Sequence, residues 1–285
     1  MSQKILLTGA TGFVGRQILR LLCESNVQTC CVVRQGKEHL LKNYDTLERV
    51  ISTPDLFAED CHFWEDACKD ISTIIHCAWY SEPGKYLQSP KNLECLSGTL
   101  QFAKGAFKSG VKRFIGIGTC AEYDLTHGLL SIHTPLNPTS LYASSKAACF
   151  LVLSQYFASI NIDFAWCRLF YLYGEGEDSR KLIAYLRMNL SQGNAAELTS
   201  GKQIRDFLDV QEAAQMIVHI AQSKHTGAYN ICSGIPITVR QFAEKIADEY
   251  GRRDLLKFNA RPENFCEPKC VVGICNSPFY TTDKH

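Results

Sequence analysis

The sequence of 285 residues contains no apolar run near the ~18 residues that a membrane-spanning helix requires. The first apolar segment begins within the first few residues, so we expect no signal peptide. The net charge is only +1 and no stripe of lysine and arginine is present, which argues against a nucleic-acid-binding surface. Internal repeats and low-complexity linkers are also lacking. These absences predict a protein that has neither a membrane nor a nucleic acid as its partner.

The 14 cysteines show no metal-binding pattern. Only Cys266, Cys270 and Cys275 form a cluster, and their spacing lacks the Cys-x2-Cys pair of a zinc site. Most of the others lie inside apolar segments, where a thiol behaves as a small hydrophobic side chain. We therefore expect no bound metal. Because no signal peptide is expected, we also expect a cytoplasmic location, which is a reducing compartment where disulfides are rare.

What the sequence does contain is a regular alternation of apolar runs and helical patterns, which is typical of parallel β-α-β units. Its composition, 46% hydrophobic and 21% charged residues, is that of an ordinary globular protein. Strands are expected at 5–8, 28–33, 73–77, 114–118 and 163–169, and helices at 14–24, 93–109 and 140–159. The pattern predicts an α/β fold with a doubly wound parallel (Rossmann) sheet, whose ligand binds beyond the carboxyl ends of the strands.

The pattern becomes less regular after Gly174, where a polar loop at 175–180 and a helix at 181–192 are expected. Residues 206–232 should return to the main domain. We therefore predict a dinucleotide-binding Rossmann domain formed by residues 1–170 and 206–232. The segments 171–205 and 233–285 are predicted to form a smaller, discontinuous C-terminal lobe that binds the substrate.

Three glycines follow the first expected strand, at a Gly-x-x-Gly-x-x-Gly spacing. Gly9 permits a tight turn, Gly12 lets the backbone approach a pyrophosphate, and Gly15 allows the following helix to pack closely on the strand. The alternative is a glycine-rich turn without a ligand, which the strand-turn-helix context disfavours. The candidate cofactor-binding residues of this segment are Gly9, Thr11, Gly12, Phe13, Val14 and Gly15.

Tyr142 and Lys146 lie four residues apart in an expected helix, so their side chains share one face. A tyrosine has an ordinary pKa of about 10 and is a poor acid–base group at neutral pH. A fixed ammonium favours the phenolate and lowers this pKa, and an oxidised nicotinamide ring in a closed cleft would add to the effect. The pair therefore predicts a proton-donating tyrosine, although Tyr-x-x-x-Lys alone occurs in many helices by chance.

Three further segments, at residues 168–174, 205–210 and 227–231, accompany these motifs. By their order and spacing the chain resembles the extended branch of the short-chain dehydrogenase/reductase superfamily, which comprises NAD(P)-dependent epimerases, dehydratases and reductases of sugar nucleotides. The resemblance covers nearly the whole chain. It implies an enzyme that takes a nicotinamide cofactor and a sugar-nucleotide substrate.

The resemblance also implies a reaction centre of Thr119, Tyr142 and Lys146. In the reductive direction Tyr142 would protonate the alkoxide that forms when hydride reaches a ketone. Thr119 would hold the same oxygen, and Lys146 would anchor the ribose hydroxyls of the cofactor while it tunes Tyr142. The alternative for Thr119 is a hydroxyl that only satisfies the end of a strand.

Arg34 follows the second expected strand, where NAD-dependent enzymes usually carry Asp or Glu and NADP-dependent enzymes tend to carry Arg. A guanidinium suits a 2′-phosphate, so we favour NADP(H). NAD(H) stays open, because Arg34 alone also fits an exposed surface residue. By resemblance, Asp55 and Leu56 would clamp the adenine, and Ala78 would lie beneath the ribose and phosphates.

The substrate contacts follow from the resemblance as well. Arg205 matches the family arginine that grips the nucleotide diphosphate; the alternative is an ion pair with Asp206 or Asp209. Tyr171 stands where relatives often carry an asparagine that contacts the substrate phosphate, and Cys95 replaces a frequent helix asparagine. Tyr171 still offers a hydroxyl to the substrate, but the phosphate environment must differ.

The residues after Thr119 bear on the type of reaction. Glu122 and Tyr123 are expected to face the sugar. Sugar-nucleotide 4,6-dehydratases carry an Asp-Glu pair directly after this threonine, whereas Cys120 and Ala121 stand here. Because neither residue is an acid or base, elimination of water is not expected.

Taken with Arg34, these features predict an NADPH-dependent reductase of a nucleoside-diphosphate 4-keto-6-deoxy sugar. Its product would be a deoxysugar donor for a surface polysaccharide. The first alternative is an NAD-dependent nucleotide-sugar C4 epimerase, and a remote one is a non-catalytic dinucleotide-binding sensor. Relatives often dimerise through two helices of each subunit; the apolar faces of 93–109 and 140–159 permit a homodimer, but burial against the sheet explains them equally well.

Overall fold

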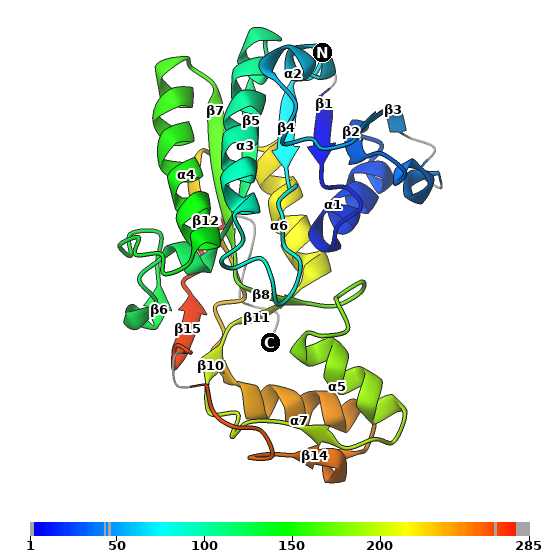
Figure 1. Cartoon of the computed structure of the whole chain (residues 1–285), viewed down its shortest axis with the longest axis vertical. Coiled ribbons are helices and arrows are strands. Elements are labelled where there is room, and N and C mark those ends of the chain that lie inside the picture. The colour runs from blue at the N-terminus through cyan, green and yellow to red at the C-terminus, as the bar shows by residue number, and fades with distance from the viewer. Residues whose placement is uncertain (1–2, 43, 45–46, 265–266, 278–285) are drawn as a thin grey trace.

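The computed structural model describes residues 3–42, 44, 47–264 and 267–277. A seven-stranded sheet lies at the centre of the molecule, in the order β12-β7-β5-β4-β1-β2-β3 (Figure 1). All of its neighbouring strands are parallel. Parallel neighbours need a crossover connection, and helices serve this purpose here. The predicted doubly wound α/β fold is confirmed.

The strands of the central sheet, in chain order, are β1 (Lys4–Thr8), β2 (Gln28–Arg34), β3 (Leu47–Thr53), β4 (Thr73–His76), β5 (Arg113–Thr119), β7 (Asp163–Leu169) and β12 (Gly227–Ile231). The α-helices are α1 (Phe13–Glu24), α2 (Cys61–Ala67), α3 (Lys91–Lys108), α4 (Leu141–Ser159), α5 (Leu182–Ser191), α6 (Val210–Gln222) and α7 (Val239–Glu249). The short strands are β6 (Leu129–Leu130), β8 (Tyr171–Tyr173), β9 (Ala196–Glu197), β10 (Ile204–Arg205), β11 (Phe207–Asp209), β13 (Ile237–Thr238), β14 (Leu256–Lys257) and β15 (Cys270–Gly273). The 3₁₀ turns are η1 (Glu38–Leu41), η2 (Cys120–Glu122), η3 (Leu125–His127) and η4 (Arg253–Leu255).

The core lies on both faces of the central sheet. Ile5 and Leu7 pack toward α1 and α6, whereas Leu6, between them, packs toward α2, α3 and α4. Figure 1 shows these two groups of helices on opposite sides of the strands. A strand that is buried on both faces reads as a continuous apolar run, which explains why the sequence pattern located these strands.

The expected strands and helices lie within two residues of the observed ones, and β7 has the expected ends. The structure adds β3, which the sequence analysis did not expect. This strand lies at the edge of the sheet, pairs only with β2 and alternates between partly buried and exposed residues. Charged residues such as Glu48 and Arg49 interrupt its apolar pattern, as is common in edge strands.

A smaller group of elements packs below the carboxyl ends of the central strands (Figure 1). Its core is made by α5 and α7 with β9 and β14. Between these elements the chain returns to the central sheet, where α6 packs on α1 and β12 pairs with β7. This path supports the proposed division of the chain into 1–170 with 206–232 and 171–205 with 233–285.

One part of the last segment lies outside that simple division. The strand β15 pairs with β6 and with β10, and Val271 packs with Cys120 and Tyr123 beside the end of β5. The far end of the chain therefore reaches back to the main sheet. Within the described ranges, no helix is long and apolar enough to cross a membrane.

Candidate active site

The glycine-rich turn between β1 and α1 forms a tight cradle. Gly9 has a φ of +75°, and a Cβ added there would lie 2.7 Å from the backbone nitrogen of Ala78. A Cβ at Gly15 would lie 2.0 Å from the carbonyl oxygen of Gly9. Gly12, the N-cap of α1, leaves the helix start without a side-chain cap or an acidic residue in its first turn. Open N–H groups and a positive helix end suit a pyrophosphate, so the cradle fits a dinucleotide.

The other candidate cofactor residues surround this cradle. Thr11, Phe13 and Val14 are partly buried at the start of α1. Ala78 follows β4, is buried, and donates its backbone N–H to the Thr8 hydroxyl at 3.3 Å. The structure thus brings β1, β4 and the glycine turn together at the carboxyl edge of the sheet, where ligands of such sheets bind.

The segment after β8 lies across the start of α1. Gln17 donates to the carbonyl oxygen of Glu175 at 3.3 Å, and the Arg20 guanidinium lies 3.5 Å from the Glu175 carboxylate. The Lys181 ammonium lies 5.3 Å from the centre of the Phe13 ring. These contacts tie the connection to the small lobe to the cofactor cradle.

The three residues assigned to the adenosine end of the cofactor, Arg34, Asp55 and Leu56, lie at or just after the ends of the neighbouring strands β2 and β3. Arg34 ends β2 and is exposed. Asp55 is exposed and accepts the backbone N–H of Phe57 at 3.0 Å, while Leu56 packs partly against the core. Their positions beside the strand ends fit the assigned roles.

Thr119 and Tyr142 lie together, as the predicted reaction centre requires. Thr119 is the last residue of β5, and Tyr142 lies in the first turn of α4. The Thr119 side chain lies next to the Tyr142 phenol. The ring of Tyr86 packs edge-on against that of Tyr142, with centroids 4.8 Å apart. The backbone N–H of Tyr142 is held by the Leu87 carbonyl at 2.9 Å.

The pKa of Tyr142 departs from the sequence expectation. Burial raises this pKa above its ordinary value, and the neighbouring Tyr86, Glu122 and Cys120 add to the rise, while the hydrogen bond to Thr119 opposes it. The expected lowering by Lys146 does not occur in the chain alone, because the ammonium is engaged elsewhere. The phenol is therefore protonated at neutral pH, which is the state of a proton donor.

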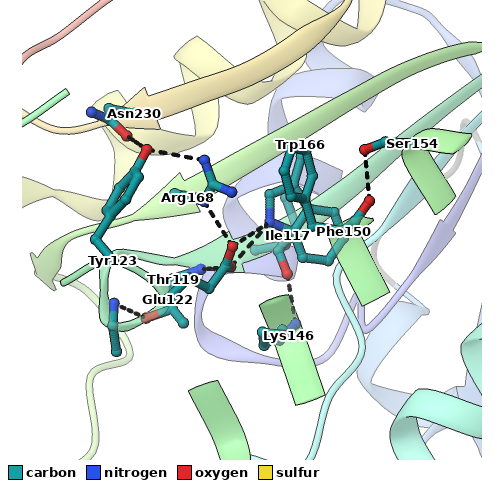
Figure 2. Close-up of polar contacts among 11 residues, drawn as sticks. Ile117, Thr119, Glu122, Tyr123, Lys146, Phe150, Ser154, Trp166, Arg168 and Asn230 are labelled. Carbon is teal, nitrogen blue, oxygen red and sulfur yellow. Dashed lines mark hydrogen bonds and ion pairs between the residues drawn. The ribbon is translucent and has the colours of Figure 1, made fainter. Parts of the chain in front are cut away.

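The Lys146 ammonium is buried between β5 and the segment after β4. It donates to the Ile117 carbonyl oxygen at 2.6 Å and lies 3.8 Å from the centre of the Trp79 ring (Figure 2 shows the Ile117 contact). Only 3% of Lys146 is exposed, and burial lowers its pKa to about 8. The lysine shares the face of α4 with Tyr142, as expected, but points deeper into the protein.

Glu122 and Tyr123 do not face a substrate, which corrects the sequence expectation. Both side chains are fully buried. Glu122 accepts from Arg168 and Trp166, and the Tyr123 hydroxyl donates to the Asn230 side chain at 2.7 Å (Figure 2). The 3₁₀ turn after β5 directs these side chains inward, where their polar groups are fully engaged.

Arg205 and Tyr171 form a second polar group at the start of the small lobe. Arg205 is 2% exposed and its guanidinium lies 5.2 Å from the centre of the Tyr171 ring. Its ion-pair partner is Glu267, at 3.6 Å. Asp206 and Asp209 were the alternative ion-pair partners expected from the sequence, and neither of them pairs with Arg205. The Arg205 Nη2 atom, which is the atom that lies 3.6 Å from the Glu267 carboxylate, is buried and has no hydrogen-bond partner among the described residues.

The two aspartates next to Arg205 have other tasks. Asp206 accepts the backbone N–H groups of Ser233, Gly234 and Gly273 at 2.7–3.1 Å. Asp209 caps the start of α6. Both carboxylates are therefore committed to the backbone.

The sequence analysis missed three residues that shape the site: Trp79, Tyr86 and Asn92. The Trp79 indole N–H donates to the side-chain oxygen of Asn92 at 2.9 Å. The fully buried Asn92 in turn donates to the Tyr86 carbonyl at 2.7 Å. Asn92 therefore fixes the loop that places Trp79 on Lys146 and Tyr86 on Tyr142. The only available signal was an aromatic pair, Trp79 and Tyr80, directly after Ala78.

The cysteine cluster was expected to bind no metal, and Cys266 lies outside the described residues. In the rest of the chain, as far as the structure describes it, no three His, Cys, Asp or Glu residues are grouped so that they could hold a metal ion.

The fold and the site define a Rossmann-type enzyme that works with a nicotinamide dinucleotide. Residues 5–232 match the NAD dependent epimerase/dehydratase family, and the chain belongs to this family. The chain is therefore an NAD(P)-dependent enzyme, and the resemblance seen in its motifs is confirmed.

The proteins that this chain resembles are named for several different reactions. The chain is 25% identical to a dTDP-6-deoxy-L-talose 4-dehydrogenase (NAD(+)) of Aggregatibacter actinomycetemcomitans, over 94% of this chain and 98% of that protein. It is 26% identical to a GDP-6-deoxy-D-mannose reductase of Pseudomonas aeruginosa, over 87% of this chain and 80% of that protein. A solved UDP-N-acetylglucosamine 4-epimerase of Methanobrevibacter ruminantium has the same fold, with a TM-score of 0.87 and 21% identity, over 99% of this chain and 94% of that chain.

Proposed function

We propose that the chain is an NADPH-dependent reductase of a nucleoside-diphosphate 4-keto-6-deoxy sugar. The observation that carries this proposal is the placement of the protonated Tyr142 next to Thr119 at the carboxyl edge of the sheet. A protonated phenol beside a second hydroxyl is suited to receive and protonate an alkoxide. The names of the two similar proteins, a deoxysugar 4-dehydrogenase and a deoxysugar reductase, support the same substrate class.

The proposed mechanism assigns each residue one task. A nicotinamide dinucleotide held by the cradle of Gly9, Gly12 and Gly15 would supply a hydride to the ketone carbon. Thr119 donates a hydrogen bond to the ketone oxygen and stabilises the charge that develops there. Tyr142 then gives its phenolic proton to the same oxygen. Lys146 would hold the ribose hydroxyls of a bound dinucleotide, and a proton returns to Tyr142 from solvent.

Elimination of water has no support in the site. Cys120 and Ala121 follow Thr119 where a dehydratase needs an acid and a base. Cys120 is buried, and burial raises the pKa of its thiol to about 12. Such a thiol is neither an acid nor a base at neutral pH, so reduction is favoured over dehydration.

The assay that tests the function compares NADPH consumption with isomer exchange. Purified protein is incubated with NADPH and a nucleoside-diphosphate 4-keto-6-deoxyhexose, and the absorbance of NADPH is followed beside chromatography of the sugar. We expect NADPH to disappear in proportion to the deoxysugar formed. Interconversion of two sugar nucleotides with no net loss of NADPH would instead establish the C4 epimerase. Binding of NADPH without any turnover would indicate a sensor.

We propose NADPH as the cofactor because of Arg34. Its side chain is exposed at the end of β2 and has no ion-pair partner within the described part of the chain. A 2′-phosphate would give it a charge-assisted, bidentate hydrogen bond. The NAD(+) in the name of the talose dehydrogenase keeps NADH as the alternative.

Replacing Arg34 with aspartate is expected to reverse the cofactor preference. Loss of a charged hydrogen bond, about 1.5–3 kcal/mol, corresponds to about a 10- to 150-fold rise in KM for NADPH. The carboxylate should at the same time lower KM for NADH, because it accepts the ribose hydroxyls. Arg180→Asp serves as a control of equal charge change. An unchanged ratio of kcat/KM for the two cofactors in Arg34→Asp would contradict the assignment.

Lys146 is expected to give the reaction a high-pH limit. Burial lowers its pKa to about 8, and the titratable groups that face it are Cys149, Glu122, Cys77, Cys95 and His76. The ammonium therefore loses its proton as pH rises through 8, while Tyr142 stays protonated. The kcat/KM for NADPH, which reports the free enzyme, should fall about tenfold per unit above that pH. In Lys146→Arg the overall rate should be lower, but the fall of kcat/KM at high pH should be absent, because a guanidinium stays charged. A wild-type profile that is flat to strongly alkaline pH would contradict the prediction.

We also propose that the protein forms a homodimer through α3 and α4. The neighbouring helices α3 and α4 both expose large apolar side chains: Leu93 and Phe107 on α3, and Leu151 and Val152 on α4. Apolar side chains gathered on a surface mark contact sites between proteins. Leu151→Glu is expected to shift the sedimentation of a dimer to that of a monomer, while Leu129→Glu, at another exposed site, should not. Equal sedimentation of both variants would contradict the proposed interface.

Two wider assignments complete the proposal. The product would be a deoxysugar donor for a surface polysaccharide, and the reaction would take place in the cytoplasm. None of the described cysteines forms a disulfide with another described residue, which supports a reducing compartment.

A further inference from the structure

Glu122 carries a carboxylate in the interior, directly behind the proposed reaction centre. The residue is 0% exposed. Its Oε1 atom accepts the backbone N–H of Thr119 at 2.8 Å and the Trp166 indole N–H at 3.0 Å. Its Oε2 atom accepts the Nε–H of Arg168 at 2.7 Å. Figure 2 shows the carboxylate among these three donors, which come from β5 and β7.

The end of β5 is shaped to admit this carboxylate. A Cβ at Gly118 would lie 2.4 Å from Glu122 Oε1 and 2.2 Å from the indole nitrogen of Trp166. A Cβ at Gly116 would lie 2.4 Å from the Trp166 ring. The strand therefore lacks side chains at the two positions where Trp166 and Glu122 must fit.

The buried charge is more than a helix cap requires. Thr119 and Glu122 form a capping box around η2, in which each side chain accepts a backbone N–H. Such a cap needs only an uncharged oxygen. Burying a carboxylate carries a desolvation penalty of several kcal/mol, which a partner such as Arg168 offsets only in part, so the pair is weak evidence for stability. A role in placing a neighbour explains it better.

The neighbour that Glu122 places is Thr119. Its backbone N–H is held by Glu122, and its hydroxyl oxygen accepts the backbone N–H of Ala121 at 3.3 Å. Lys146 holds the same strand two residues earlier, through the Ile117 carbonyl. The carboxyl end of β5 is thus held at two backbone positions, which fixes the Thr119 side chain next to Tyr142.

We propose that Glu122 is a positioning residue of the reaction: its carboxylate, held by Arg168 and Trp166, fixes the backbone of Thr119 so that the threonine hydroxyl meets the reacting oxygen beside Tyr142. Glu122 touches neither substrate nor cofactor and acts through Thr119. The inference rests on the proposed function, since it assumes that Thr119 holds the oxygen that Tyr142 protonates.

The test compares two double variants, because Glu122 alone cannot be removed without leaving Arg168 unpaired. Glu122→Leu with Arg168→Met replaces the pair by apolar side chains of similar volume and removes the acceptor for Thr119. Glu122→Gln with Arg168→Met also removes both charges, but restores an oxygen that can accept the Thr119 N–H. Neither double buries a charge, but the leucine double should unfold at a lower urea concentration than the glutamine double, because the buried N–H groups of Thr119 and Trp166 lose their acceptor.

We expect the leucine double to lower kcat by about 10²-fold, since a displacement of about 1 Å costs this much, while KM for NADPH stays unchanged. The glutamine double should recover most of the lost kcat. Exchange of the Thr119 amide proton with solvent is measured by NMR in the absence of substrate. It should be fast in the leucine double and slow in the glutamine double. Tyr123→Phe, which removes the contacts of the tyrosine hydroxyl with Arg168 and Asn230 and leaves Glu122 in place, is the control for a purely structural effect and should keep wild-type kcat.

Either of two results overturns the inference. One is wild-type kcat in the leucine double, and the other is equal kcat in the two doubles despite different exchange rates. The proposed function fails separately, if the wild-type protein reduces no keto-sugar nucleotide. In that case slow exchange in the wild type and the glutamine double, with fast exchange in the leucine double, would still establish that Glu122 holds Thr119, whereas equal exchange in all three would reject it.

Discussion

Replacing Tyr142 with phenylalanine is expected to lower kcat by about 10²- to 10⁴-fold, the range that one positioned acid–base group contributes. The ring is retained, so its edge-on contact with Tyr86 and the start of α4 should be preserved. Only the phenolic hydroxyl is lost. NADPH affinity should therefore stay within about threefold of wild type, since the cradle at Gly9 to Gly15 is untouched.

The measurement is single-turnover reduction at saturating NADPH and keto-sugar nucleotide, beside a fluorescence titration with NADPH. Tyr156→Phe is the matched control, because it makes the same change farther along α4, away from the site. It should leave kcat unchanged. Turnover that survives in Tyr142→Phe would show that another group supplies the proton.

The direction of the proposed reaction depends on the state of this phenol. Burial raises the pKa of Tyr142, so the proton is present and ready to be given to an alkoxide. An epimerase uses the same tyrosine in both directions and needs the phenolate as well as the phenol. The proposed reduction requires a tyrosine that begins each cycle as an acid, and a protonated Tyr142 meets this requirement.

The elements buried on both faces could be predicted from the sequence. The strand β7, for example, carries an apolar run from Phe164 to Cys167, and its position follows largely from this hydrophobicity. The edge strand β3 could not, because its exposed charged residues are tolerated only where one side of a strand remains open. The position of β3 depends on its pairing with β2, and the sequence of β3 itself does not indicate this pairing.

The candidate site was predictable where a motif fixes the backbone, and not where a distant residue fixes a side chain. The positions of Thr119 and Tyr142 follow from a strand end and a helix start. The inward direction of Glu122 depends instead on Arg168, which lies 46 residues away on β7. In the same way Arg205 pairs with Glu267 rather than with the nearby aspartates, because those carboxylates already bind backbone N–H groups.

The second large effect is expected at Arg168. Replacing it with methionine alone leaves the Glu122 carboxylate buried without its cation, which should lower the free energy of unfolding by about 3–5 kcal/mol. The whole side chain is involved, because Arg168 also lies between the rings of Tyr123 and Phe150, at 4.6 and 4.5 Å. Methionine fills part of this space, so the loss should come mainly from the unpaired charge.

Urea unfolding of Arg168→Met beside Arg180→Met isolates the effect of burial. The Arg180–Asp178 pair has a similar distance, 2.8 Å against 2.7 Å, but its arginine side chain is 56% exposed, whereas that of Arg168 is 1% exposed. An exposed pair contributes only about 0–1 kcal/mol, so Arg180→Met should unfold almost like the wild type. Adding Glu122→Leu to Arg168→Met should then restore most of the lost stability, because the stranded charge is removed. If the double variant stayed as unstable as the single one, the loss would come from packing around the guanidinium, and the carboxylate would not be the costly group.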